Sequence, residues 1–340
     1  MSATITKYYS FDYILSHNAV YNFVVGARGL GKTYGAKRKA IKAFLKRNDQ
    51  FVYTRRYKDD LKGRWSFFAD IEHEFPEWEF RVNGLIAECA PSATRGQKKR
   101  DWKTMGYFVA LSQAQTFKSV SFPKVTLVIF DEFIIEKGAM HYLPREAKAF
   151  NDLFSTIDRY QERTRVLFLA NTVSIMNPYF LEYGIRPDED KELTVHHDGF
   201  IACHFPESSE FQNEVYATKF GRFIQGTEYG EYAVGSQFHD NNDHLIVGKT
   251  GQARYKYTLE TAQGVFSVWH DIRTDAFYVQ ERRPTNELCV TLLPEAMREG
   301  WKLVTYNDKI LQFLRASFRR GKVYFDTPNS RNAMIEVFKR

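Results

Sequence analysis

The chain is poor in cysteine and has no long apolar run or Pro-, Gly- or Ser-rich tract. Its three cysteines, Cys89, Cys203 and Cys289, are far apart and odd in number, which argues against a disulfide framework and favours a reducing compartment. No run reaches the roughly 18 apolar residues of an ordinary membrane-spanning helix, and the first residues lack the pattern of a secretion signal. The composition, 44% hydrophobic and 16% aromatic, supplies material for packed cores.

The length of 340 residues exceeds the size at which one hydrophobic core usually stops growing, so two domains are expected. Lysine and arginine number 48 against 41 acidic residues, giving a net charge of +7. This charge is compatible with a polyanionic partner without requiring one.

Short apolar runs alternate with helical patterns in the first half of the chain. The runs are residues 20–25, 50–54, 106–111, 125–130 and 165–170. Runs that are apolar almost throughout are typical of strands buried on both faces of a parallel sheet. Residues 32–47 and 145–157 have the periodicity of amphipathic helices. The alternation predicts an α/β domain with a mostly parallel central sheet.

The first run leads into "GARGLGKT", which fits the phosphate-loop pattern G-x-x-x-x-G-K-[ST] between a strand and a helix. Small residues allow backbone amides to surround phosphates, and the helix N-terminus adds partial positive charge. Lys32 would reach the β- and γ-phosphates of ATP, and Thr33 would ligate Mg²⁺. The alternative is a Gly-rich turn bearing a surface lysine. The predicted nucleotide-binding residues are Gly26, Ala27, Arg28, Gly29, Leu30, Gly31, Lys32 and Thr33.

Two acids follow the run at 125–130, where ligands of open α/β sheets bind. Asp131 is predicted to hold the Mg²⁺ shell, and Glu132 to act as general base on the attacking water. A solvated strand end is the alternative for this pair. Asn171 ends the next run and would sense the γ-phosphate, or else simply opens a turn.

Arg159, Arg163 and Arg165 cluster near the end of the helix predicted at 145–157. An arginine there could reach the nucleotide of a neighbouring subunit and stabilise transition-state charge. Solvated charges at a helix end are the commoner explanation.

Several segments together resemble the DNA-packaging ATPases of small short-tailed phages with protein-primed genomes. They are "NFVVGARGLGKTY", "FVYTRRYK", "VIFDEFI", "NPYF" and "FGRFIQGTEYGE", within residues 22 to 238. The resemblance implies a phosphate-loop ATPase of the ASCE class that forms a homo-oligomeric ring, expected as a pentamer. Such a ring docks on the portal of an empty capsid in the host bacterial cytoplasm, is absent from the mature virion, and pumps double-stranded DNA inward. Some members also use a phage-encoded RNA, and the sequence leaves this open here.

Carried over by position, the resemblance implies that Arg159 is the trans-acting arginine finger. Lys118 aligns with a basic residue that the family supplies across the subunit interface. The roles of the nucleotide-site residues stay as predicted for Lys32, Thr33, Asp131 and Glu132.

A DNA translocase contacts phosphates without reading bases, which requires basic and amide side chains. The segment at 91–103 is the best candidate because five basic residues crowd between two expected strands, although solvated charge is an equal alternative. They are Arg95, Lys98, Lys99, Arg100 and Lys103. The basic face of the helix at 32–47 is a weaker candidate.

The pattern changes after about residue 198, so the predicted parts are an ATPase domain at 1–198, a linker at 199–238 and a second domain at 239–340. Near-alternating runs from 244 to 283, then helix, strand and helix, resemble a smaller α+β ribonuclease H-like domain. Asp271 and Asp326 are the only acids placed at strand positions, too few for a two-metal nuclease. A non-catalytic domain that binds nucleic acid or portal is therefore expected.

Residues 196–204 contain four side chains suitable for zinc: His196, His197, Cys203 and His204. Their spacing matches no compact paired-ligand site, so a strand with incidental histidines is favoured.

Two further functions stay open. A cellular helicase or recombination-type ATPase would prefer single strands and unwind duplexes. A nucleotide-dependent binding switch would hydrolyse little, which Glu132 opposes because a switch has less need of a base. A nucleotide kinase lacks support, because we find no Arg-rich lid segment.

Overall fold

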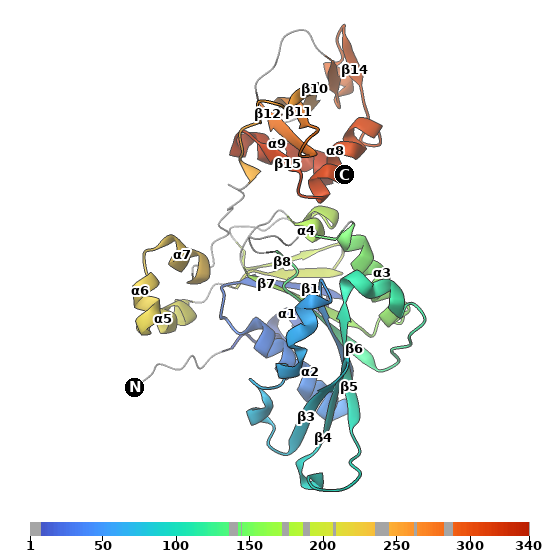
Figure 1. The fold of residues 1–340 in the computed structure, drawn as a ribbon, viewed down its shortest axis with the longest axis vertical. Coiled ribbons are helices and arrows are strands. Elements are labelled where there is room, and N and C mark those ends of the chain that lie inside the picture. Colours follow the sequence, from blue (N-terminus) through green and yellow to red (C-terminus); the bar gives the residue numbers. More distant parts are fainter. Residues whose placement is uncertain are drawn as a thin grey trace. The chain divides into compact units, whose positions relative to one another are not determined.

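The computed structural model describes residues 8–135, 142–143, 145–171, 177–185, 191–206, 209–234, 245–261, 264–281 and 288–339 (Figure 1). The chain divides into two compact units. The first comprises Met1–Lys137, Ala147–Val173 and Arg186–His239, and the second Gly138–Glu146, Ser174–Ile185 and Asp240–Arg340. Within the described residues, no helix combines the length and apolar character needed to cross a membrane.

A nine-stranded sheet, counted over the described residues, forms the centre of the first unit, in the order β3-β4-β5-β2-β6-β7-β1-β9-β8. Its six neighbouring strands from β5 to β9 in this order are parallel, which confirms the predicted α/β class. They are β5 (Lys103–Ala110), β2 (Gln50–Arg55), β6 (Val125–Asp131), β7 (Arg165–Asn171), β1 (Tyr21–Gly26) and β9 (Ile201–His204). Nearly every residue of β1, β2, β6 and β7 is buried, as expected for strands covered on both faces.

Helices cover both faces of this sheet. On one face, α2 (Lys32–Arg47) buries Ala36, Ala40, Ile41 and Phe44 against alternate residues of the strands. On the other face, Phe150 of α3 (Glu146–Asp158) contacts the rings of Phe130 and Phe168. The shorter helices of this part are α1 (Asp12–Ser16), η1 (Asp59–Ser66), η2 (Glu72–Glu74), η3 (Ser92–Thr94) and η4 (Leu111–Phe117).

Antiparallel strands extend the sheet at both edges, and the sequence did not predict them. At one edge, β3 (Trp78–Asn83) pairs with β4 (Ile86–Pro91), which pairs with β5. At the other edge, β8 (Leu193–His196) pairs with β9. The residues of β3 and β8 are mostly half-exposed, so these strands lack the continuous apolar run of a central strand.

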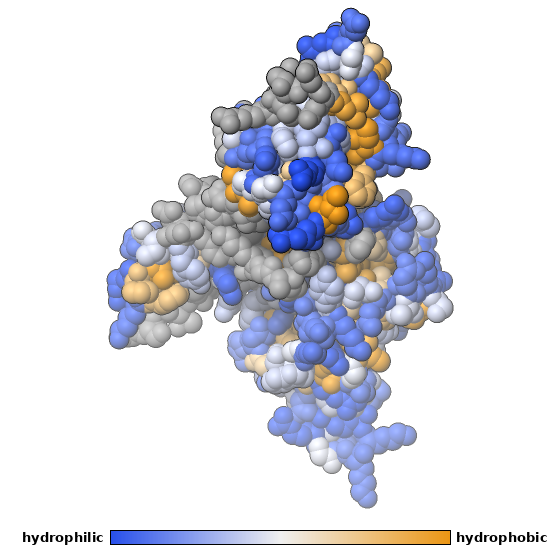
Figure 2. Space-filling model, turned by 45° about the horizontal axis from the view of Figure 1, so that its top comes forward, coloured by the Kyte–Doolittle hydropathy of each residue, from blue (hydrophilic) through white to orange (hydrophobic). Residues whose placement is uncertain are grey.

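The predicted domain boundary at residue 198 is wrong, because β9 pairs with β1 inside the sheet. The predicted linker is also structured: it contains β9 and the helices α5 (Ser209–Ala217), α6 (Lys219–Ile224) and α7 (Glu228–Val234). The amide of Arg28 donates to the carbonyl of Ala233 at 3.1 Å, so α7 is bonded to the phosphate loop. An apolar patch is visible on these helices in Figure 2, where Phe220 and Phe223 are exposed.

The second unit contains a mixed six-stranded sheet, again counted over the described residues, in the order β14-β13-β10-β11-β12-β15. Its strands are β10 (Arg254–Thr261), β11 (Gly264–Asp271), β12 (Ala276–Gln280), β13 (Cys289–Thr291), β14 (Trp301–Leu303) and β15 (Val323–Phe325). The helices are α4 (Pro178–Glu182), η6 (Pro294–Ala296), α8 (Lys309–Arg319) and α9 (Pro328–Lys339). Strands β10, β11 and β12 form an antiparallel meander within the near-alternating runs of residues 244–283. Helices α8 and α9 pack on this sheet to give a separate α+β unit. The first of the near-alternating runs, residues 244–249, is not a strand over its described part, where Ile246 makes an isolated bridge to Phe325.

Candidate active site at the carboxyl edge of the parallel strands

The phosphate loop connects the end of β1 to the start of α2. Gly29 and Gly31 have φ of 85° and 78°, in the left-handed region that favours glycine. Gly31 caps α2 without a side chain, so the first amides of the helix face outward for a ligand. A Cβ at Gly31 would lie 2.4 Å from the ring of Tyr8, so the position also requires glycine sterically.

Lys32 is buried at the base of this loop. Its Nζ donates to the carbonyl oxygens of Gly26 and Ala27, both at 2.8 Å, and to Oδ1 of Asn171 at 3.2 Å. The structure thus brings Asn171, at the end of β7, to the phosphate loop. Here the amide orients the ammonium group that would meet the phosphates.

Asp131 and Thr33 meet next to the loop, although 98 positions separate them in sequence. The Thr33 hydroxyl lies 3.1 and 3.0 Å from the two carboxylate oxygens of Asp131. A hydroxyl and a buried carboxylate at this spacing are oxygen ligands of the kind that Mg²⁺ prefers, so these residues fit the predicted metal site.

Tyr53 supports Asp131 from the neighbouring strand β2. Its hydroxyl donates to Oδ2 of Asp131 at 2.8 Å in the sheet interior. Burial, and then the charge of Asp131, raise the pKa of Tyr53 well above its ordinary value, so the phenol stays protonated and remains a donor.

Glu132 follows Asp131 in a left-handed conformation, with φ of 56°. Its carboxylate forms an ion pair with Arg55, and its amide donates to Oδ1 of Asp131 at 3.1 Å. The Glu132 side chain is 58% exposed, so water reaches it. A carboxylate held by a guanidinium is a poorer proton acceptor, so the pair with Arg55 would have to open for Glu132 to act as the predicted base.

The sequence reasoning missed Tyr53, Arg55 and Arg56 as parts of this site. They follow each other at the end of β2, in the segment "FVYTRRYK". The available signal was the same one that identified Asp131: polar residues at the carboxyl end of a buried parallel strand.

Arg159 and Lys118 lie away from the site of their own chain. Arg159 follows α3 and precedes β7, and its guanidinium approaches the carbonyl of Val120 at 3.5 Å. Lys118 caps η4, lies two residues before Val120 and is exposed. Arg159 precedes β7 and therefore lies towards the amino end of that strand, whose seven residues span about 20 Å.

Asp158 organises the loop that carries Arg159. Its carboxylate accepts hydrogen bonds from four backbone amides at 2.9 to 3.2 Å, those of Gln161, Glu162, Arg163 and Thr164. Arg159, Tyr160 and Glu162 all have positive φ, and Tyr160 is 91% exposed. Burial raises the pKa of Asp158, but hydrogen bonds from Thr164 and the loop amides outweigh it and lower the pKa overall.

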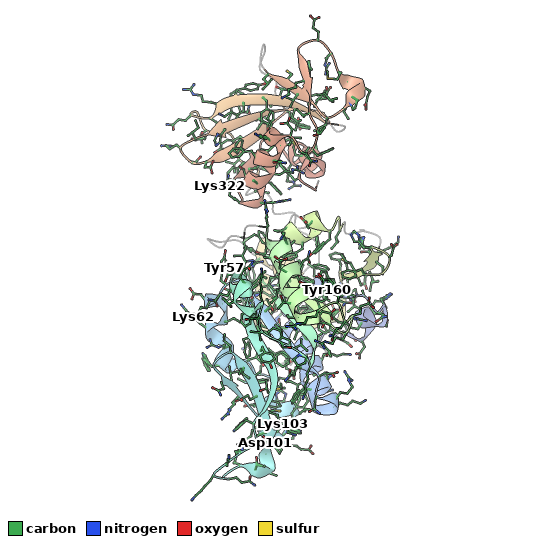
Figure 3. The ribbon with its side chains drawn as sticks, turned by 90° about the vertical axis from the view of Figure 1, so that its right-hand side faces the viewer. Tyr57, Lys62, Asp101, Lys103, Tyr160 and Lys322 are labelled. Atoms are coloured by element: carbon green, nitrogen blue, oxygen red, sulfur yellow. The ribbon has the colours of Figure 1, made fainter. Side chains whose placement is uncertain are left out.

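The basic segment at 91–103 connects β4 to β5. Arg95 and Arg100 both form ion pairs with Glu79 of β3, and the guanidinium of Arg100 lies 4.7 Å from the centre of the Trp102 ring. Arg100 therefore holds the loop together and is largely covered, which weakens its candidacy as a DNA contact. The exposed members of the predicted set are Arg95, Lys98, Lys99 and Lys103. Figure 3 shows Lys103 far from Tyr160 in the same unit.

Three of the four residues considered for zinc have other environments. Nδ1 of His204 lies 2.6 Å from the Tyr9 hydroxyl, and Nε2 of His196 lies 2.9 Å from the Thr194 hydroxyl. Burial raises the pKa of the Cys203 thiol, which opposes the thiolate that zinc requires. Over the described ranges, no cluster of three or more His, Cys, Asp or Glu side chains is suited to a metal.

The two acids considered for a nuclease are also engaged in local structure. Asp271 accepts from the Thr250 hydroxyl at 2.6 Å and from the amide of Arg273 at 3.0 Å. Asp326 accepts from the amide of Glu281 at 3.1 Å. These contacts brace turns at the ends of β11 and β15.

Comparison with known proteins identifies the family. Residues 4–340 match the podovirus DNA encapsidation protein (Gp16) family. The DNA packaging protein of Bacillus phage phi29 is 34% identical over 336 residues, covering 98% of this chain and 97% of that protein. The DNA packaging protein of Bacillus phage B103 is 35% identical over 330 residues, covering 96% and 99%.

Solved structures agree with this result. A chain of the bacteriophage phi29 viral genome packaging motor assembly has a TM-score of 0.59 at 34% identity, covering 98% of this chain and 100% of that one. The N-terminal domain of the phi29 DNA packaging ATPase has a TM-score of 0.53 at 38% identity, covering 60% and 98%. These matches and the phosphate-loop site together show that the chain belongs to the podovirus DNA encapsidation protein family.

Proposed function

We propose that this protein hydrolyses ATP and uses the energy to move double-stranded viral DNA into a preformed capsid. The observation that carries the proposal is the contact of Thr33 with Asp131 beside the phosphate loop, with Glu132 next in sequence, in a chain of the packaging family. The names of its relatives, a DNA packaging protein and a packaging ATPase, support the same activity.

In this proposal the phosphates of ATP lie on the amides of the loop and of the first turn of α2. Lys32 exchanges a loop carbonyl for phosphate oxygens while Asn171 keeps its ammonium group in place. Thr33 and Asp131 hold Mg²⁺, which when bound neutralises charge on the phosphates. Glu132, released from Arg55, orients the attacking water and accepts its proton.

A neighbouring subunit supplies the remaining positive charge. Arg159 precedes β7, at the strand end opposite the one that carries the site, which supports the inference that it and Lys118 act on the next copy in a ring. The ordered loop after Asp158 favours this role, because a preorganised arginine needs less ordering on insertion. Hydrolysis in one subunit would then depend on the position of its neighbour, so the subunits could hydrolyse ATP in order around the ring.

The proposed partners follow from the family. They are double-stranded DNA, the portal vertex of the capsid, and further copies of this chain in a ring, expected as a pentamer. The use of a phage-encoded RNA stays open. The relative seen in a packaging motor assembly supports a role on the procapsid. We place the protein in the host bacterial cytoplasm while it docks there, and outside the mature virion. The exposed residues Arg95, Lys98, Lys99 and Lys103 remain candidates for phosphate contacts.

Steady-state ATP hydrolysis with and without linear double-stranded DNA tests the proposal. We expect duplex DNA to stimulate hydrolysis, and both Glu132→Gln and Arg159→Ala to abolish it while nucleotide binding persists. Mixing the two inactive variants provides a control for a shared site. An Arg159→Ala chain can still present Glu132, and a Glu132→Gln chain can still present Arg159, so some activity should return.

Other outcomes separate the alternatives. Stimulation by single-stranded DNA together with duplex unwinding would indicate a helicase. Nucleotide binding without hydrolysis, both with duplex DNA and with assembled capsids, would indicate a switch and refute the motor.

A further inference from the structure

Arg56 is an almost completely buried charge beside the candidate general base. Its side chain is 2% exposed, and its two terminal nitrogens donate to backbone carbonyls of the turn after β6. The acceptors are the oxygens of Glu132, at 3.2 Å, and of Phe133, at 2.5 Å. Burying a charge costs free energy unless polar partners compensate. Hydrogen bonds to these two carbonyls offset part of the desolvation cost of the Arg56 guanidinium.

The turn that Arg56 binds has an unusual backbone. Glu132 is left-handed, a conformation that is unfavourable for a residue with a Cβ and persists only where the surroundings impose it. The amide of Phe133 returns to the carbonyl of Leu169 at 3.1 Å, so β7 holds the chain immediately after the turn. Arg56 binds the two carbonyls at the turn itself, which are the groups that a change of the Glu132 backbone would move.

Arg55 contacts the side chain of Glu132, whereas Arg56 contacts the backbone carbonyls of Glu132 and Phe133. Successive side chains of a strand point to opposite faces, so Tyr53 and Arg55 share one face and reach the two carboxylates. Arg56 points to the other face, where its guanidinium lies 5.9 Å from the centre of the Phe130 ring. Its planar fork suits two carbonyls at once, a geometry that the single ammonium group of lysine cannot reproduce.

We propose that Arg56 is a positioning residue for Glu132: its guanidinium fixes the left-handed turn that presents the Glu132 carboxylate to the attacking water. The proposal rests on the function proposed above, in which Glu132 is the general base. Arg56 does not touch the reacting atoms, and its effect passes through the backbone of residues 132 and 133.

The test uses the full-length chain with duplex DNA and compares Arg56→Lys and Arg56→Gln with wild type. Gln is included because it removes the buried charge while keeping a donor for one carbonyl. We expect kcat to fall at least tenfold in both variants, with the Kd for a fluorescent ATP analogue within twofold of wild type. Arg64→Lys is the matched control, because Arg64 also donates to two backbone carbonyls, those of Gly84 and Leu61, away from the site. Its kcat and Kd should be unchanged.

A double-mutant cycle distinguishes positioning from a structural role. In the Glu132→Gln background, measured by single-turnover hydrolysis, Arg56→Lys should change the residual rate by less than twofold, because the group it positions is already gone. An equal fold-loss in both backgrounds would overturn the inference, as would loss of nucleotide binding in both Arg56 variants. High activity of Glu132→Gln alone would show that Glu132 is not the base. It would thereby refute both the proposed role of Glu132 and the positioning role of Arg56.

Discussion

Asp158 is the best place to test whether the loop that follows it, residues 159–164, is preorganised. Asp158→Asn keeps the size of the side chain but replaces one acceptor oxygen with an NH₂ group. The carboxylate accepts Gln161 and Glu162 at one oxygen and Arg163 and Thr164 at the other. The oxygen of asparagine can accept from one pair of amides, whereas its NH₂ group, a donor, would lie against the N–H donors of the other pair.

The size of the effect follows from these contacts. Hydrogen bonds to a charged group contribute about 1.5–3 kcal/mol each. Loss of one pair of amides therefore destabilises the closed loop by at most about 3–6 kcal/mol. Part is recovered because the freed amides of this surface loop can bind water. We therefore expect opening of the loop to become easier by about 2–4 kcal/mol, which is about 30- to 1000-fold in its opening equilibrium.

Hydrogen exchange measured by mass spectrometry over residues 159–165 reads this opening directly. Protection of the four amides should fall by that factor in Asp158→Asn, and DNA-stimulated hydrolysis should fall with it. Asp152→Asn is the matched control on the same helix. The Asp152 carboxylate lies in an exposed pair with Lys148 at 3.6 Å, so this variant should change protection less than threefold. Unchanged protection in Asp158→Asn would refute the reasoning.

The stabilisation of the loop by Asp158 depends on pH in a direction that its pKa shift fixes. The pKa of Asp158 is lowered in the folded chain, so its stabilisation is fully present above the unfolded pKa of about 3.9. It is lost as the pH falls through the lower folded value. The difference in loop protection between wild type and Asp158→Asn should be constant above about pH 5 and shrink below about pH 4.

Three further outcomes are expected. Gly31→Ala should weaken ATP binding at least tenfold, because a left-handed backbone and a 2.4 Å contact both oppose a Cβ there; equilibrium titration measures it. Tyr53→Phe removes a hydrogen bond to the charged Asp131 and should raise the Mg²⁺ concentration needed for half-maximal nucleotide binding about tenfold. In native protein at pH 8, DTNB should leave Cys89 and Cys203 unmodified, because burial raises the pKa of Cys89 to about 11 and that of Cys203 further.

Matched variants sharpen these tests. Gly84→Ala introduces the same kind of strain, at φ of 60°, but has open space around the new Cβ, so ATP binding should not change. Tyr257→Phe removes a buried hydroxyl that has no hydrogen-bond partner in the described residues, and the Mg²⁺ requirement should not move. Equal effects of test and control variants, or rapid labelling of all three thiols, would contradict the corresponding argument.

The sequence predicted the parts of the fold whose signal is local. All five apolar runs became parallel strands of one sheet, because a strand buried on both faces must be apolar along its length. The phosphate loop and the pair Asp131 and Glu132 were equally predictable in position, since strand ends carry the ligands in such sheets. The edge strands β3 and β8 were missed because their half-exposed residues resemble those of loops.

The residues of β2 that contact Asp131 and Glu132 were not predictable from a local pattern. That β2 lies beside β6 is a property of the strand order, and only this order brings Tyr53 to Asp131 and Arg55 to Glu132. The error at residue 198 has a similar cause, because β9 is only four residues long and gains its identity by pairing with β1. Long-range pairing decided each of these features, and a local pattern does not contain it.

Strand β2 links the candidate active site to the segment that we propose acts on the next subunit. Its end contacts both acids through Tyr53 and Arg55, and the carbonyl of Arg56 accepts the amide of Ser112 at 2.9 Å. Ser112 is the second residue of the short helix η4, which Lys118 caps. Lys118 lies two residues before Val120, whose carbonyl Arg159 approaches. A displacement of the β2 end when Glu132 leaves Arg55 would therefore be transmitted through η4 to the residues proposed to act in the neighbouring site. Such a continuous bonded path is a physical route by which hydrolysis in one subunit could affect the next.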